Sequence, residues 1–349
     1  MNAAIQRLAR RVWSGEGGVA GSLLSALLMP AEWVWRFAMT LRNRHLDRTP
    51  PNVVQGLYVV SVGNLAVGGT GKTPITSWLA KAVAEMGGRP AILHGGYGRD
   101  EPMLHQRWTP DVPVFVERDR VEGGRRAVEY GADVAVLDDG FQHRRIARDV
   151  DLVVLAAEDP FPGPLLPRGP YREPVASLER ADAIVISRRT AGEDAASALA
   201  DRVRALVPGT PVVACVHLEP AGLRPFASLA GANVRPGSTE AVRPSTLDTV
   251  MVLTAVGRPD TVLKNVSRVV GGDVSLRAYA DHHEFSRGDV RDARRRAGGQ
   301  PIVVTEKDAV KLERFADELG TCYVIQQTLT WDWGEQDVCS LLRIPGLCR

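Results

Sequence analysis

Short runs of consecutive apolar residues alternate with longer amphipathic stretches along the chain after residue 56. Apolar runs of about four to eight residues bounded by Gly, Pro or Asp predict buried strands, whereas apolar residues that recur every three or four positions predict helices. The predicted strands are 57–62, 90–93, 112–116, 134–137, 152–156, 183–187 and 212–216, and the predicted helices are 73–86, 121–130 and 195–206. Apolar strands that alternate with helices are typical of a parallel sheet covered on both faces, so the pattern predicts an α/β fold.

A stretch rich in Gly, Pro and Ser interrupts this alternation at residues 219–246. Such a composition without periodicity is typical of a linker between domains. The alternation then resumes with predicted strands 250–255, 302–305 and 322–326 and predicted helices 260–270, 287–297 and 309–319. Since 349 residues suffice for two domains of ordinary size, we predict four parts. They are an N-terminal segment 1–48, a first α/β domain 49–218, a linker 219–247, and a smaller C-terminal α/β domain with a tail, 248–349.

The N-terminal segment is unusually apolar between residues 19 and 41 and is flanked by arginines. As one helix it would be roughly 34 Å long, enough to cross the hydrocarbon core of a membrane. Pro30, Glu32 and Arg36 oppose a simple span, because charges are costly at mid-bilayer. The aromatic residues that favour an interfacial helix are Trp33, Trp35 and Phe37. We predict a membrane-associated helix, with a soluble helix packed on the domain as the alternative; the absence of a small-residue cleavage site opposes a signal peptide.

The composition narrows the class of protein further. The apolar fraction of 44% and the charged fraction of 24% are those of a globular chain. A net charge of only +2 opposes a general nucleic-acid binder. The four cysteines form no C-x-x-C pair, which opposes a structural zinc site or a disulfide framework and fits a reducing compartment. No feature indicates an obligate protein partner.

A phosphate-binding loop is predicted at residues 66–73, between a predicted strand and a predicted helix. The pattern G-x-x-x-x-G-K-[ST] is met except that Ala66 replaces the first glycine. Its backbone N–H groups would converge on phosphate oxygens, Lys72 would reach the β- and γ-phosphates of ATP, and Thr73 would bind Mg²⁺. The predicted nucleotide-binding residues here are Gly68, Gly69, Thr70, Gly71, Lys72 and Thr73. The alternative is a glycine-rich turn that contains Lys-Thr by coincidence.

Two adjacent carboxylates, Asp138 and Asp139, follow the predicted strand 134–137 and precede Gly140. Taken alone, this pattern is most often a turn. After a phosphate-binding loop, it predicts the second half of a Mg²⁺ site, because two neighbouring carboxylates repel each other unless a cation or hydrogen-bond donors compensate them. We therefore predict an ATP·Mg²⁺ site with Thr73, Asp138 and Asp139 on its metal side.

Four further groups of polar residues carry candidate chemistry, and each also has a simpler explanation. Asp100-Glu101-Pro102 could be a turn or a helix start, and Arg172-Glu173 a surface ion pair. Asp281-His282 could be a helix cap or a solvated pair, and the segment 305–308, Thr-Glu-Lys-Asp, could cap a helix.

The phosphate-binding loop, Asp138-Asp139, Arg172-Glu173, Asp281-His282 and the segment 305–308 occur in that order along the chain. Together the motifs resemble those of the tetraacyldisaccharide 4′-kinase family, the lipid A kinases of Gram-negative bacteria. The resemblance runs from the N-terminal apolar segment to about Leu312. It implies a P-loop NTPase-like fold with two α/β/α domains joined by a β-linker, with ATP and lipid meeting between them. It also implies transfer of the ATP γ-phosphate to the 4′-hydroxyl of a tetraacylated glucosamine disaccharide 1-phosphate. The implied location is the cytoplasmic face of the inner membrane, peripheral or through one N-terminal helix.

The resemblance also implies residue roles. Asp100 matches the general base for the acceptor hydroxyl, and His282 matches the histidine paired with it. Arg172 and Glu173 match residues near the transferring phosphate. The residues that would shape the nucleotide side of the cleft are Thr305, Glu306, Lys307 and Asp308.

This chain departs from the family pattern on the acceptor side. The family usually has Arg-Gly-Tyr-Gly where this chain has 95–98, Gly-Gly-Tyr-Gly, so that Arg99 is the nearest substitute for the missing charge. The family usually also has a longer insertion before the Asp-Glu-Pro element.

Two other hypotheses remain: a P-loop kinase or ligase of a soluble small molecule, and a regulatory P-loop NTPase that binds a protein. The latter usually carries Asn-Lys-x-Asp, which this sequence lacks.

Overall fold

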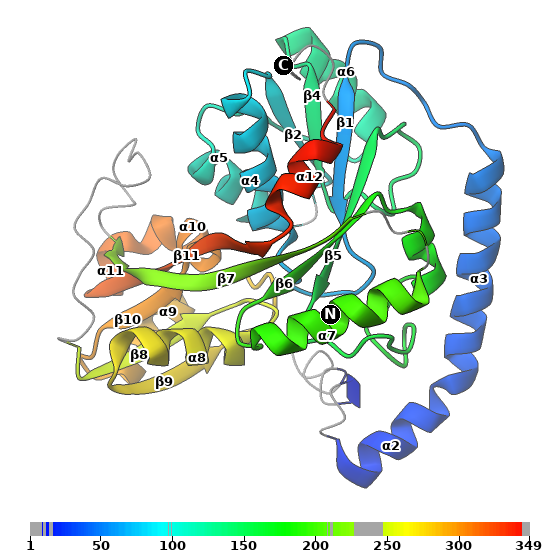
Figure 1. Cartoon of the computed structure of the whole chain (residues 1–349). Helices are drawn as coiled ribbons and strands as arrows, with labels where there is room; N and C mark the ends of the chain where they lie inside the picture. The colour runs from blue at the N-terminus through cyan, green and yellow to red at the C-terminus, as the bar shows by residue number, and fades with distance from the viewer. Residues whose placement is uncertain are drawn as a thin grey trace. The chain divides into compact units, whose positions relative to one another are not determined.

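The computed structural model describes residues 9, 12–13, 17–96, 98, 100–207, 209, 212–226 and 247–343. By its contacts the chain divides into two units, each built from separate stretches of sequence (Figure 1). The first unit comprises Met1–Tyr97, Thr109–His217 and Trp331–Arg349, and the second comprises Gly98–Trp108 and Leu218–Thr330. Compared with the predicted ranges 49–218 and 248–349, residues 98–108 group with the second unit and residues 331–349 with the first.

The first unit is built on a sheet with strand order β3-β2-β4-β1-β5-β6-β7. Its strands are β1 (Tyr58–Gly63), β2 (Pro90–His94), β3 (Val114–Val116), β4 (Val134–Asp138), β5 (Val150–Ala156), β6 (Ala183–Arg188) and β7 (Val212–Pro225). Each neighbouring pair is parallel. Its helices are α4 (Lys72–Glu85), α6 (Arg120–Tyr130), α7 (Glu193–Leu206) and α12 (Glu335–Leu341).

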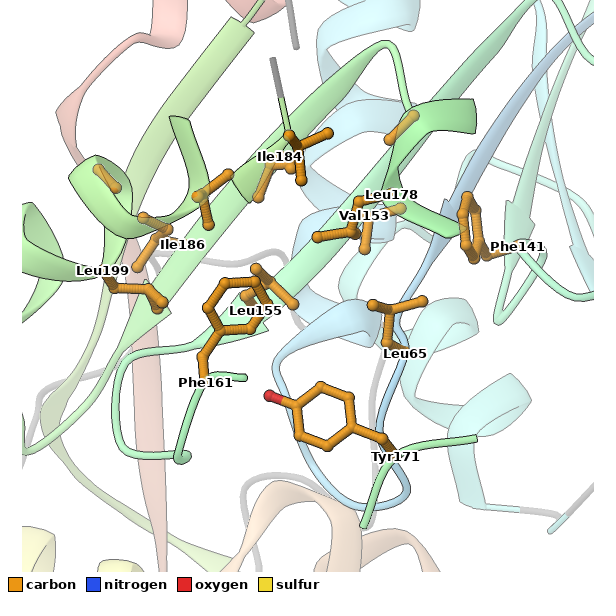
Figure 2. Close-up of a cluster of buried hydrophobic side chains, with 14 of the residues drawn as sticks. Leu65, Phe141, Val153, Leu155, Phe161, Tyr171, Leu178, Ile184, Ile186 and Leu199 are labelled. Carbon is orange, nitrogen blue, oxygen red and sulfur yellow. The ribbon is translucent and has the colours of Figure 1, made fainter. Parts of the chain in front are cut away.

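Helices cover both faces of this sheet, which explains why most residues of its strands are apolar. Val59 and Ala135 belong to a core cluster that includes residues of α6. Their neighbours Val60 and Val136 point the opposite way, because side chains alternate along a strand, and α4 buries its own apolar residues against β1, β2 and β4 there. A second cluster joins β5 and β6 to α7 (Figure 2). The predicted α/β fold is confirmed.

The second unit has the strand order β11-β10-β8-β9. Its strands are β8 (Thr249–Thr254), β9 (Asp273–Ala278), β10 (Ile302–Thr305) and β11 (Cys322–Trp333), again in parallel pairs. Its helices are α5 (Asp100–Trp108), α8 (Pro259–Val270), α9 (Arg287–Ala297), α10 (Glu306–Leu312) and α11 (Ala316–Leu319). Two strands, β7 and β11, run from one unit into the other, so the linking segments include β-structure.

Several predicted elements need correction. Strand β7 continues to Pro225, into the range 219–247 predicted as a linker, while 227–246 lies outside the described residues. The sequence pattern missed β9, whose residues are half-exposed or exposed as expected of an edge strand, so it lacks an apolar run. The predicted helix 309–319 is instead α10, which starts at Glu306, followed by a 3₁₀ turn and α11.

The N-terminal segment forms two helices, not the single helix predicted over 19–41. They are α2 (Gly18–Leu27) and α3 (Met29–Arg48), with Pro30 in the first turn of α3, where its missing N–H is tolerated. No single helix among the described residues is long and apolar enough to span a membrane; α2 and α3 together meet that test of length and composition, bent by 47°. Glu32, predicted to oppose a simple span of the membrane, is 5% exposed.

Candidate functional site

The phosphate-binding loop connects the end of β1 to the start of α4. Gly68 and Gly71 have φ values of 115° and 96°, which residues with side chains rarely adopt, so both glycines are needed for this turn. Ala66 forms an antiparallel bridge with Tyr171, and Val67 N donates to Pro170 O at 2.8 Å. Ala66 therefore lies in a short extended segment, and neither Ala66 nor Val67 has a positive φ. This explains why the first glycine of the motif can be replaced.

Buried side chains fix the conformation of this loop from within. Asn64 Nδ2 donates to Thr70 Oγ1 at 2.9 Å, and Ser187 Oγ donates to Thr70 O at 2.5 Å. Thr70 is only 2% exposed, so its side chain faces inward, whereas Gly68 and Gly69 have no atom within 4 Å of a Cβ position. The loop is thus anchored at Thr70 and open at its glycines, as a phosphate-binding turn requires.

Of the two carboxylates predicted to bind the metal, Asp138 is the last residue of β4 and Asp139 follows it. They lie beside the start of this loop, since Val62 pairs with Asp138 across the sheet. Asp138 is 1% exposed, and its Oδ1 accepts from Thr76 Oγ1 at 3.5 Å. Thr73, the third predicted ligand, lies in the first turn of α4. A hydroxyl and two carboxylates form the all-oxygen donor set that Mg²⁺ prefers, so the residues present fit the ion.

Asp139 lies between two cations of the first unit. Its carboxylate is 3.5 Å from Lys72 Nζ and 3.0 Å from Arg172 Nη1. Burial raises the pKa of Asp139, but Lys72 and Arg172 outweigh it, so that the pKa lies well below its ordinary value. A nucleotide phosphate would find both cations already gathered beside the loop.

Arg172 and Glu173 point in different directions, so they do not form the ion pair considered as an alternative. Arg172 faces Asp139 and also donates to Gln142 Oε1 at 3.3 Å. Glu173 is fully buried and accepts hydrogen bonds from Arg180 Nη2 and Asn43 Nδ2, both at 3.0 Å. Burial raises the pKa of Glu173, but Arg180 and Asn43 lower it to a net value below the ordinary one. Glu173 is therefore an ionised anchor of the loop, not a group exposed to phosphate.

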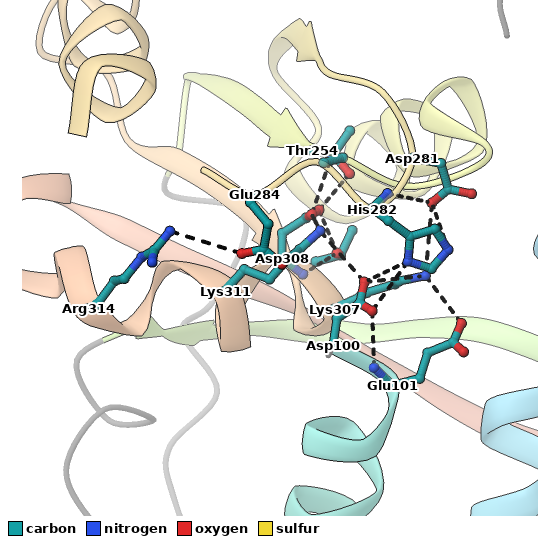
Figure 3. A network of polar contacts seen from close by, with 12 residues as sticks. Asp100, Glu101, Thr254, Asp281, His282, Glu284, Lys307, Asp308, Lys311 and Arg314 are labelled. Atoms are coloured by element: carbon teal, nitrogen blue, oxygen red, sulfur yellow. Dashed lines mark hydrogen bonds and ion pairs between the residues drawn. The ribbon is translucent and has the colours of Figure 1, made fainter. Parts of the chain in front are cut away.

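In the second unit, Asp100 and His282 form an acid–histidine pair (Figure 3). Asp100 begins α5, and His282 lies in the turn after β9. His282 Nδ1 is 3.2 Å from Asp100 Oδ2 and 3.3 Å from Oδ1. The side chain of Asp100 is 2% exposed, whereas that of His282 is 43% exposed. Of the two, His282 is the member that a substrate can reach.

Two lysines of α10 surround Asp100 on its buried side. Lys307 Nζ lies 3.5 Å and Lys311 Nζ 3.7 Å from Asp100 Oδ2. Burial raises the pKa of Asp100, but His282, Lys307 and Lys311 lower it far below its ordinary value. The hydrogen bond to Asp100 raises the pKa of His282 above its ordinary value of 6.5, against the opposing effect of burial. The aspartate is thus held as an anion, and the histidine is the titrating member.

The segment 305–308, predicted for the nucleotide side, has its contacts within the second unit. Thr305 is the N-cap of α10 and accepts from Asp308 N, which is the helix-cap alternative considered above. Asp308 is fully buried, and its oxygens accept from Thr254 Oγ1 and Ala255 N. Glu306 accepts from Trp108 Nε1 at 3.0 Å, and burial raises its pKa. Only Lys307 belongs to the acid–histidine cluster, where it also contacts Glu101 at 3.3 Å.

Backbone strain marks both clusters. Among the described residues that are not glycine, only Asp139 and His282 have positive φ, at 54° and 59°. Such residues are uncommon and concentrate at functional sites, where surrounding structure holds them in place. Gly98 adds a steric requirement, because a Cβ there would lie 2.6 Å from Asp100 Oδ1 and 3.0 Å from His282 Nδ1. Tyr97 and Arg99, relevant to the departure from the family pattern, lie outside the described residues.

Sequence reasoning gave no role to several residues that the structure places in these clusters. Gln142 and Lys311 each lie three positions after a predicted site residue, Asp139 and Asp308, so their nearness in the sequence was the available signal. The sequence gave no sign that residues of the N-terminal helix contact the loop around Arg172, because their partners are more than a hundred positions away. These residues are Glu32, Trp35 and Asn43. The sequence analysis considered Glu32 and Trp35 only with respect to the membrane.

Comparison with known proteins identifies the family of this chain. A sequence model of the tetraacyldisaccharide-1-P 4′-kinase family matches residues 24–100 and 99–343. The tetraacyldisaccharide 4′-kinase of Anaeromyxobacter sp. (strain K) is 41% identical over 331 residues, covering 86% of this chain and 85% of that protein. The kinase of the same name from Syntrophus aciditrophicus is 34% identical, covering 88% and 90%.

A solved structure shares the fold. The crystal structure of LpxK from Aquifex aeolicus in complex with ATP superposes with a TM-score of 0.69 at 24% identity, covering 91% of this chain and 98% of that one. The family model and the relatives cover both the phosphate-binding loop and the acid–histidine pair. This chain belongs to the tetraacyldisaccharide-1-P 4′-kinase family.

Proposed function

We propose that this chain transfers the γ-phosphoryl group of ATP to the 4′-hydroxyl of a tetraacylated glucosamine disaccharide 1-phosphate. The observation that carries the proposal is the presence of an acid–histidine pair in a chain that also has a phosphate-binding loop. Transfer to an alcohol requires a group that accepts the hydroxyl proton, and phosphate binding alone does not supply one. Membership in the family supports the identity of the acceptor.

On the nucleotide side, the proposed roles follow from the first unit. The glycines at 68, 69 and 71 and the N-terminus of α4 bind phosphate oxygens through backbone N–H groups. Lys72 and Arg172 neutralise charge that develops on the γ-phosphate. Mg²⁺, when bound, stabilises the same charge and orients the phosphates. Thr73, Asp138 and Asp139 are the residues that would hold it.

On the acceptor side, the exposed His282 takes the hydroxyl proton and the buried Asp100 fixes the ring. Asp100 holds Nδ1–H, which leaves Nε2 as the basic nitrogen of the neutral ring. Asp100 itself is shielded by two lysines and too acidic to remove a proton from an alcohol efficiently. This assigns the roles within the pair differently from the family resemblance, which gave the base to Asp100.

The rate is expected to rise with pH through the pKa of His282, which lies above 6.5. Below that pKa the ring is protonated and accepts nothing; above it the neutral ring accepts the proton. Asp100→Asn removes the main cause of the raised pKa, so the rising limb should move to lower pH as the maximal rate falls. The measurement is kcat against pH for both proteins at saturating ATP. If kcat of Asp100→Asn rises over the same pH range as that of the wild type, the role of His282 is contradicted.

We also propose that the acceptor is reached at the cytoplasmic face of the inner membrane. Apolar side chains of α2 and α3 are solvent-exposed, which is costly unless another surface covers them. They are Val19, Leu23, Leu27, Met29, Trp33, Val34, Phe37 and Leu41. A tryptophan and arginines on such helices suit the headgroup region of a bilayer.

The direct test uses the purified full-length chain with Mg·ATP and the acylated disaccharide 1-phosphate in detergent micelles. The expected product is a 4′-phosphorylated lipid, identified by mass spectrometry and ³¹P NMR. The same assay with the deacylated disaccharide, and without any acceptor, tests the alternatives. Phosphate transfer to the soluble sugar at an equal rate would favour a small-molecule kinase. Release of phosphate into water without lipid product would favour a regulatory NTPase.

A further inference from the structure

Helix α3 presents two chemically different faces. One face carries the exposed side chains of Trp33, Val34 and Phe37. The other carries side chains that contact the segment 164–174, here named the arginine loop, which includes Arg168, Arg172 and Glu173. Helix α3 therefore contacts the arginine loop through polar groups, while the ring of Trp35 also packs against a hydrophobic core cluster and the exposed apolar groups lie on the other face.

Three side chains of α3 make hydrogen bonds to the arginine loop. Trp35 Nε1 donates to Arg172 O at 2.9 Å, and Asn43 Nδ2 donates to the fully buried Glu173 at 3.0 Å. Glu32, itself 5% exposed, accepts from Leu165 N and from Arg168 Nη1, both at 3.1 Å. Backbone bonds and buried charged groups of this kind fix a loop more strongly than contacts between exposed side chains.

The other side of the arginine loop pairs with the phosphate-binding loop. Arg172 N donates to Leu65 O at 2.7 Å, and Pro170 O accepts from Val67 N at 2.8 Å. The Arg172 side chain then reaches Asp139 at 3.0 Å. The arginine loop is thus held between α3 and the phosphate-binding loop, and the carbonyl bonded by Trp35 belongs to the same residue whose guanidinium meets Asp139.

We propose that α3 is a positioning element of the phosphotransfer site, with Trp35 and Asn43 as positioning residues that act through Arg172. The proposal rests on the proposed function, since it takes Arg172 to stabilise the γ-phosphate. It extends that function by linking catalysis to the helix whose opposite face carries the apolar groups. Loss of either contact lets the arginine loop shift, and Arg172 then spends less time beside Asp139.

The test is a double-mutant cycle in the full-length enzyme. Trp35→Phe keeps an aromatic side chain and removes the N–H donor together with the five-membered ring of the indole. Its kcat should fall about fivefold to tenfold, as expected for one hydrogen bond, with the KM for lipid unchanged. In an Arg172→Ala background the same change should lower kcat no further, because the residue through which it acts is gone. Asn43→Ser is the second positioning variant, and thermal unfolding of each protein checks that it is folded.

The matched control is Thr40→Ala on the same helix, whose hydroxyl donates only to Arg36 O within α3. This variant should keep the wild-type kcat. If Trp35→Phe lowers kcat equally with and without Arg172, the proposal is overturned. A raised KM for lipid at unchanged kcat would also overturn it, because it would indicate that Trp35 acts in lipid docking alone. Mg·ATP affinity, measured by calorimetry in all four proteins of the cycle, should show the same non-additivity. If the wild type fails to phosphorylate the disaccharide, only the proposed function is overturned. The measurement of Mg·ATP affinity then still tests the role of α3.

Discussion

His282→Ala is expected to lower kcat at least about a hundredfold while leaving the affinity for Mg·ATP nearly intact. The histidine is the accessible member of the acid–histidine pair, 43% exposed beside an aspartate that is 2% exposed. Removing it leaves Asp100 between Lys307 and Lys311, where the carboxylate is too weak a base to replace it. Single-turnover kinetics separates this chemical step from binding, and calorimetry measures the nucleotide affinity.

The chain provides an internal control for that result in the adjacent histidine. His283 pairs with Asp289 at 3.1 Å, much as His282 pairs with Asp100, but it stacks on Tyr279 with ring centroids 4.6 Å apart. His283→Ala should therefore lower the midpoint of thermal unfolding and leave kcat close to that of the wild type. Equal losses of kcat in the two variants, or a parallel loss of nucleotide affinity in His282→Ala, would mean that His282 is misassigned.

Lys72→Ala is expected to reduce kcat/KM for ATP on the order of a thousandfold, with affinity and turnover falling together. Lys72 lies at the first position of α4, where its ammonium is 3.5 Å from Asp139. Without it, Asp139 keeps only Arg172 as a close cation, and a bound triphosphate would face a less compensated carboxylate. Equilibrium binding of ATP and steady-state kinetics in the same buffer measure both effects.

Lys81→Ala is the matched control, since Lys81 is an exposed lysine on the same helix, away from its N-terminus. It should leave both parameters unchanged. If Lys72→Ala binds ATP with normal affinity, the ammonium acts only on the transition state. If its turnover is also normal, Lys72 does not belong to the site.

The first unit was largely predictable because its signals are local. Strands buried on both faces leave continuous apolar runs, and the turn at Gly68 and Gly71 leaves glycines where φ must be positive. Asp138 was found because it ends such a run, and the pairing of β4 with β1 brings it beside the phosphate-binding loop. Local pattern and tertiary structure agree at these positions.

The second cluster could not be derived from spacing, because its members come from distant parts of the chain. Nothing near Asp100 in the sequence indicates that two lysines of α10 approach it, or that its helix groups with the second unit. The family resemblance supplied the pair of Asp100 and His282, but not the burial that makes His282 the accessible member. The role of Glu32 was missed for the same reason, since a charge in an apolar stretch gives no sign of its partner.

The grouping of α5 with the second unit also constrains how the protein is made. On the ribosome, α5 emerges before the remaining 222 residues that end at Thr330 (330 minus 108) have been synthesised. At about 5–20 residues per second, this helix waits roughly 10–45 seconds for the strands and helices that bury Asp100. A gene fragment that begins at Leu218 would lack Asp100 entirely, so dividing the gene at that boundary separates the two halves of the acid–histidine pair.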